Sequence, residues 1–84
     1  MSLSIIIPAY NETNQINHTV KKLNKLKKKI NNHEIIFIDD FSEDNTYQKL
    51  KKIEKTHNRI RVFKNKKKGL GQAVELGVLK SKKE

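Results

Sequence analysis

The sequence predicts an α/β fold with three layers, in which a parallel sheet lies between helices in βαβαβα order. Two apolar runs, at residues 5–9 and 35–38, stop abruptly in polar residues, as strands buried on both faces of a sheet do. Between and after them, apolar residues recur at helical spacing. Strands that alternate with helices form parallel sheets with right-handed crossovers.

The first strand is expected to end at Pro8, because a residue without an N–H cannot continue the ladder. A helix should follow, with Asn11 or Thr13 as its N-cap. Its inward stripe consists of Ile16, Val20, Leu23, Leu26 and Ile30.

The second strand should cover 35–38, and Ser42 or Asp44 can cap the helix after it. That helix should turn Tyr47, Leu50 and Ile53 inward. Residues 59–63 predict a shorter third strand at a sheet edge or on a half-exposed face. A basic loop over 65–71 leads to a third helix, whose packed face is Leu70, Ala73, Val74 and Gly77.

Length and composition limit the functional classes. With 84 residues the chain is at most one small domain, and without cysteine it has no disulfide or thiolate metal site. No apolar run is long enough to span a bilayer, and the N-terminus lacks the pattern of a signal peptide. We therefore expect a cytoplasmic protein, soluble or peripheral to the membrane.

The formal charge of +10 comes mostly from lysine clusters. Such charge attracts nucleic acid, anionic lipid or phosphorylated ligands, although lysines on a helix are also simply a solvated face. Nucleic acid is the weaker candidate, because Arg59 and Arg61 are the only arginines and aromatic residues are few.

All three strand-to-helix loops should emerge at the same edge of the sheet, where open α/β folds bind ligands. These loops are 8–12, 39–44 and 65–71. Segments far apart in the sequence thus converge on one candidate pocket.

The first loop offers Tyr10, for stacking on a base or for packing, and Glu12, for a ligand hydrogen bond or for the helix dipole. The adjacent Asp39 and Asp40 should send one carboxylate to each side of the strand end. One of them can cap the helix, or the pair can bind a base or ribose, a metal, or a phosphoryl group. The ends of the other strands do not support the phosphoacceptor scheme of receiver domains.

The third loop, with Lys68, Gly69 and Gly71, has the flexible backbone and the cations that a phosphate needs beside a helix N-terminus. It is neither a Walker motif nor a dinucleotide fingerprint, because no Gly-Lys-Ser/Thr occurs and the third glycine is missing.

Together, residues 4–12, 34–46 and 68–73 resemble three successive motifs of the family 2 glycosyltransferases. The third motif is similar to the corresponding motif in the branch of the family that transfers sugars to polyprenyl phosphates, the branch of dolichol-phosphate mannose synthase. The resemblance covers nearly the whole chain. It implies the nucleotide-binding half of a GT-A (Rossmann-like) fold and a nucleoside diphosphate sugar as donor.

The resemblance assigns nucleotide binding to Pro8, Tyr10, Glu12, Asp39, Asp40, Lys68, Gly69 and Gly71. The first loop would embrace base and ribose, Asp40 with Asp39 would bind the base, and the glycine loop would lie near the diphosphate. Phe41 departs from the glycine that is common in the family at this position.

The family's Asp-x-Asp, which holds Mg²⁺ or Mn²⁺, does not occur in the sequence, and no residue matches its catalytic base. Residues 1–84 are therefore expected to be a single partial domain that binds the donor but does not transfer it. A lipid phosphate at a membrane surface is the implied acceptor. An uncovered sheet edge favours self-association. The alternative is a small basic module that binds nucleic acid or anionic membrane.

Overall fold

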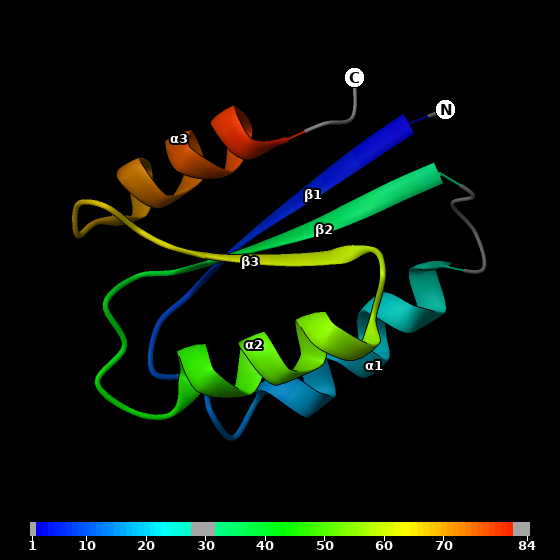
Figure 1. Ribbon diagram of the computed structural model, residues 1–84, viewed down its shortest axis with the longest axis horizontal. Helices are drawn as coiled ribbons and strands as arrows, with labels where there is room; N and C mark the ends of the chain where they lie inside the picture. Colours follow the sequence, from blue (N-terminus) through cyan, green and yellow to red (C-terminus); the bar gives the residue numbers. More distant parts are fainter. Residues whose placement is uncertain (1, 28–31, 82–84) are drawn as a thin grey trace.

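A computed structural model describes residues 2–27 and 32–81 of the chain (Figure 1). Its sheet contains the parallel strands β1 (Ser2–Ala9), β2 (Asn32–Asp39) and β3 (Ile60–Lys64), with β2 in the centre. Each strand is followed by a helix: α1 (Ile16–Lys27), α2 (Thr46–Thr56) and α3 (Leu70–Lys80). The predicted βαβαβα order is confirmed.

The helices cover both faces of the sheet, which confirms the three layers. In Figure 1, α1 and α2 lie side by side below the strands, and α3 lies above them. Strand β2 is buried on both sides. Ile35 and Phe37 belong to the core between the sheet and helices α1 and α2, whereas Ile36 and Ile38 pack with α3. This two-sided burial is why the strand is an unbroken apolar run.

Strand β1 extends one residue beyond the predicted end. Pro8 lies within the ladder, in register with Ile38, and β1 ends at Ala9. The prediction was wrong because an edge strand tolerates proline where its nitrogen faces away from the neighbouring strand.

The predicted helix starts also need correction. Helix α1 begins at Ile16, so neither Asn11 nor Thr13 is its N-cap. Helix α2 begins at Thr46, after Asn45, but the Asp44 carboxylate accepts the Thr46 N–H at 2.9 Å. Of the stripe predicted for the first helix, Ile30 lies outside the described residues.

The packed face of α3 is confirmed in part. Ala73 and Gly77 are buried as predicted, whereas Leu70 and Val74 are exposed and Leu76 is buried instead. Gly77 lies directly over β1, where an added Cβ would clash with the side chain of Ile6. The close approach of α3 to the sheet therefore depends on the absence of a side chain at this position.

The two edges of the sheet differ. At the β3 edge, Glu54 of α2 accepts the Val62 N–H at 2.7 Å, and the His57 carbonyl accepts the Ile60 N–H at 3.1 Å. Within the described residues, no backbone N–H of β1 has such a partner outside the sheet. Edge β1 is thus the one open to strand pairing.

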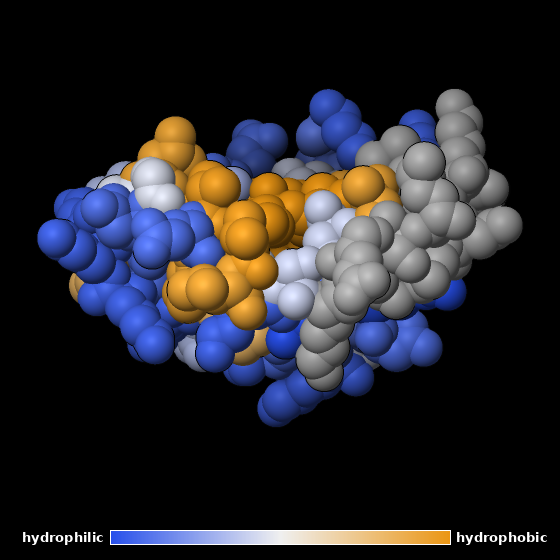
Figure 2. All heavy atoms as spheres, turned by 90° about the horizontal axis from the view of Figure 1, so that it is seen from above, coloured by the Kyte–Doolittle hydropathy of each residue, from blue (hydrophilic) through white to orange (hydrophobic). Residues whose placement is uncertain are grey.

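The side of the molecule formed by α3 carries exposed apolar residues. Figure 2, which views the molecule from above, shows a band of apolar side chains across this face. The exposed members on α3 are Leu70, Val74, Val78 and Leu79. Apolar surface of this kind marks contact sites more often than bulk surface does.

Substituting Gly77 tests the packing of α3. We expect Gly77→Val to lower the free energy of unfolding by about 1–3 kcal/mol, because the side chain overpacks against Ile6. Gly71→Ala is the matched control, since a Cβ there meets nothing within 4 Å and alanine favours the helix. Urea unfolding followed by circular dichroism measures both, and equal stability of Gly77→Val and the parent would contradict the packing argument.

The hydrogen bond by which the Glu54 carboxylate covers the β3 edge should stabilise the fold in a pH-dependent way. Burial raises the pKa of Glu54, but hydrogen bonds from Lys51 and the Val62 N–H, with the Lys51 and Arg61 charges, lower it below its usual value overall. A depressed folded-state pKa means that this stabilisation is complete above the usual pKa of 4.5 and is lost as the pH falls through the folded-state value.

We therefore expect Glu54→Gln to cost about 1 kcal/mol of unfolding free energy at pH 7 and progressively less below pH about 4.5. Urea titrations of both proteins from pH 7 to pH 3 give this difference. A difference that stays constant with pH would show that the ionised carboxylate does not provide this hydrogen bond.

Candidate functional site

The carboxyl ends of the three strands meet at one edge of the sheet. Ala9, Asp39 and Lys64 are in register there, and hydrogen bonds carry the pairing one residue further. The Asp40 N–H donates to the Ala9 carbonyl, and the Asn65 N–H donates to the Asp39 carbonyl, both at 2.8 Å. The three loops therefore start from fixed positions beside one another.

Asn11 joins the first loop to the second. Its N–H donates to the Ser42 hydroxyl at 2.9 Å, and its side-chain oxygen accepts the Glu43 N–H at 2.8 Å. Its backbone has a φ of +48°, in the left-handed region that asparagine tolerates better than most residues. Asparagine thus serves here as a loop connector rather than as a helix cap.

The buried hydroxyl of Thr46 is a second connection between these loops. It accepts the Glu12 N–H at 2.8 Å and donates to the Asp44 carboxylate. This hydrogen bond from Thr46 is the main reason that the pKa of Asp44 lies below its usual value. The first turn of α2 thereby fixes the backbone of the loop that carries Tyr10 and Glu12.

Asp40 holds the third loop. Its Oδ1 accepts the Gly69 N–H and the Asn65 side-chain N–H, both at 3.0 Å. Gly69 has a φ of +133°, a conformation that side chains rarely allow, so glycine is needed where α3 begins. Within the described residues, Oδ2 of Asp40 has no hydrogen-bond partner and remains available to a ligand.

A pocket of about 260 Å³ lies between the first loop and the start of α3. Its lining comprises Pro8, Ala9, Tyr10, Glu12, Asp40 and Leu70. Lys68 approaches it, with Nζ 5.7 Å from the centroid of the Tyr10 ring. An aromatic ring, two carboxylates and a nearby ammonium group can together bind a planar, polar and phosphorylated molecule.

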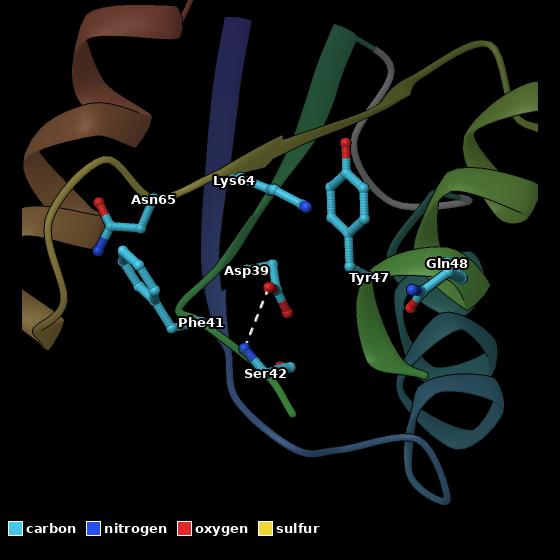
Figure 3. A pocket seen from close by; sticks show the side chains of 7 residues that line it. All are labelled: Asp39, Phe41, Ser42, Tyr47, Gln48, Lys64 and Asn65. Atoms are coloured by element: carbon cyan, nitrogen blue, oxygen red, sulfur yellow. Dashed lines mark hydrogen bonds between the residues drawn. The ribbon is translucent and has the colours of Figure 1, made fainter. Parts of the chain in front are cut away.

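Two of the predicted site residues lie elsewhere. Asp39 lines a different pocket, on the side of α2, and its Oδ2 accepts the Ser42 N–H at 3.2 Å (Figure 3). The acidic pair thus sends its side chains to opposite sides of the strand end, as expected for neighbouring residues of a strand. Gly71 lies in the first turn of α3 and not in the loop.

Phe41 has a φ of +59°, the left-handed conformation in which a bulky residue is strained. The glycine that is common in the family at this position would adopt it without strain. The turn is nevertheless formed, because Ser42 on one side and Asp40 on the other are both held by hydrogen bonds.

Two residues that organise the site were not among the predicted ones. Asn65 is buried, bridges Asp40 to the Gly69 carbonyl and accepts the Lys66 N–H. Thr46 connects the first two loops. Nothing in the sequence distinguishes such polar residues from ordinary loop residues, because the contacts that join the loops, from Asn65 to Asp40 and from Glu12 to Thr46, link residues far apart in the chain.

The acidic residues that the structure describes do not form a metal site. Among the described residues, no three or more His, Cys, Asp or Glu side chains gather in a way that could hold an ion. The adjacent aspartates diverge, and each has an oxygen that accepts N–H groups. The donor set therefore does not fit Mg²⁺ or Mn²⁺.

Comparisons with known proteins identify the family of this chain. The sequence matches the family described as "Glycosyl transferase family 2" over residues 4–84. It is also 31% identical, over 77 residues, to a dolichol-phosphate mannosyltransferase from Pyrococcus furiosus. The 77 aligned residues make up 92% of this chain and 22% of the relative. The chain thus spans about a fifth of the relative's length. Because the family match covers nearly the whole chain, the chain belongs to glycosyltransferase family 2.

Proposed function

We propose that this chain binds a nucleoside diphosphate sugar in the pocket between its first loop and α3. The observation that carries the proposal is the meeting of three separate motifs at this pocket. The first motif supplies Pro8, Tyr10 and Glu12, and the second supplies Asp40. Lys68 of the third motif lies next to the pocket, near the Tyr10 ring. Together they supply a ring to stack on, a free carboxylate oxygen and a cation.

Each part of the donor has a counterpart in the site. The Tyr10 ring stacks on the base, while Oδ2 of Asp40 accepts an N–H from the base edge. Glu12 accepts a ribose hydroxyl. The diphosphate lies near Gly69, where the N-terminus of α3 and Lys68 provide positive charge.

We propose that a lipid phosphate at a membrane surface is the acceptor in the reaction for which the donor is bound, and the match to a dolichol-phosphate mannosyltransferase supports this. The exposed Lys21, Lys22 and Lys25 of α1 suit a peripheral contact with anionic lipid on the cytoplasmic side. None of the helices described is both long and apolar enough to cross a bilayer.

The contribution of the 84-residue chain is donor binding without transfer. A departing diphosphate needs its charge neutralised, which family members achieve with Mg²⁺ or Mn²⁺ at an Asp-x-Asp. The sequence contains no Asp-x-Asp, and the described acidic residues form no equivalent cluster.

Asp40→Asn tests donor binding directly. Asparagine can keep the Oδ1 contacts to Gly69 and Asn65 while it replaces the free Oδ2 acceptor with a donor. Titration with GDP-mannose and UDP-glucose, followed by NMR chemical shifts, should show binding to the parent that weakens about tenfold or more in the variant.

Glu75→Gln is the control for this titration, because it removes an exposed carboxylate from α3 and should leave the affinity unchanged. The same samples, incubated with a polyprenyl phosphate, should form no glycosylated lipid. Equal affinities of Asp40→Asn and the parent would contradict the site. Product formation would contradict the restriction to binding.

We further propose that the open β1 edge and the apolar face of α3 support self-association. Sedimentation velocity should show a mass that increases with concentration between about 10 and 500 µM. Val78→Lys places a charge on this face, where Val78 is 60% exposed, and should shift the protein toward monomer. Lys52→Gln, on the opposite layer, should not. A strictly monomeric parent protein at all concentrations would overturn this part of the proposal.

A further inference from the structure

A second pocket, of about 270 Å³, lies on the other side of the β2 end, against the start of α2 (Figure 3). We propose that it binds a small zwitterion of the amino-acid type, with its ammonium group at Asp39, its acid group at Lys64, and an apolar or aromatic side chain against the rings that line the pocket. This site is separate from the proposed nucleotide pocket, because Asp39 and Asp40 line different cavities. It does not depend on the function proposed above.

The buried carboxylate of Asp39 is the strongest sign of a ligand. Its residue is 3% exposed, and Oδ2 accepts the Ser42 N–H, but Oδ1 is buried and has no hydrogen-bond partner in the described structure. A buried carboxylate oxygen without a partner is costly, typically by more than an unpaired neutral group. An ammonium group that enters the pocket supplies both the missing hydrogen bonds and the opposite charge.

Lys64 supplies the second end of the site. Its Nζ lies 4.5 Å from the centroid of the Tyr47 ring, and within the described residues it forms no ion pair. Figure 3 shows the Lys64 side chain extending from the end of β3 toward Tyr47, beside the Asp39 carboxylate. A ligand with an acid group can thus pair with Lys64 while its ammonium group faces Asp39.

Two aromatic rings lie on opposite sides of Asp39 in Figure 3, Phe41 and Tyr47. Phe41 is 48% exposed and is held at a φ of +59° although glycine would fit without strain. Strained residues concentrate at functional sites, because only a gain elsewhere maintains them. The two rings favour a ligand with an aromatic body, which the charged ends alone would not require.

The test uses L-phenylalanine as the probe, with two analogues that each retain one charged end. Chemical-shift titration of the complete 84-residue chain should show saturable binding in the millimolar range, with shifts at Phe41, Ser42 and Tyr47. Phenethylamine lacks the acid group and 3-phenylpropionate lacks the ammonium group, so each should bind at least tenfold more weakly. No saturable binding of L-phenylalanine, or equal binding of either analogue, overturns the proposal.

Asp39→Asn and Lys64→Gln should each weaken L-phenylalanine binding at least tenfold, whereas Glu75→Gln and Lys52→Gln should not change it. Asp39→Asn should also raise the melting temperature, by about 4 °C or more, because it replaces a buried carboxylate, whose Oδ1 has no hydrogen-bond partner among the described residues, with a neutral amide. A lower melting temperature for Asp39→Asn would show that the carboxylate serves the fold. Unchanged binding in Lys64→Gln would overturn the two-ended site even if the Asp39 variant did not fold.

Discussion

The central strand β2 is the constraint on which the rest of the structure depends. Its side chains alternate between the two faces of the sheet, as in any strand, and both faces are buried because one is covered by α1 and α2 and the other by α3. The alternation continues past the last apolar residue, so that Asp39 and Asp40 leave the sheet on opposite sides. One strand thereby supplies an acidic side chain to each of two pockets, and we assign the two carboxylates to different ligands.

The loops at this edge are held by polar side chains rather than by an apolar core. The side chains of Asn11, Asp44 and Thr46 each accept a backbone N–H from another loop. The side chain of Asn65 donates to Asp40 of the second loop and to the Gly69 carbonyl of its own loop. Such networks orient a site well when every member is paired. Oδ1 of Asp39 and Oδ2 of Asp40 lack hydrogen-bond partners in the described residues, and each of these two residues lines a pocket. The unpaired atoms of the network are thus the ones that we assign to ligands.

Much of the fold could be predicted because it depends on local patterns. The apolar run 35–38 predicted a strand buried on both faces, and the helical spacing of Leu50 and Ile53 predicted the inward side of α2. The face of α3 could be predicted only in part this way. Ala73 and Gly77 are buried as their spacing predicted, but Leu70 and Val74 are exposed and Leu76 is buried instead. Leu70, Val74 and Leu76 are all apolar and border the same small-residue face, so the periodic pattern alone does not decide which of them packs on the sheet.

The sequence by itself determined the order of strands and helices and the edge at which the site lies, because hydrophobic periodicity and parallel topology suffice for both. It also determined the residue types at that edge, including the acidic pair and the glycine loop. Only the tertiary structure decided that Asp40, and not Asp39, shares a pocket with Tyr10, and that Asn65 and Thr46 organise the loops. These pairings join residues about 25 to 34 positions apart, and so depend on packing that local patterns do not encode.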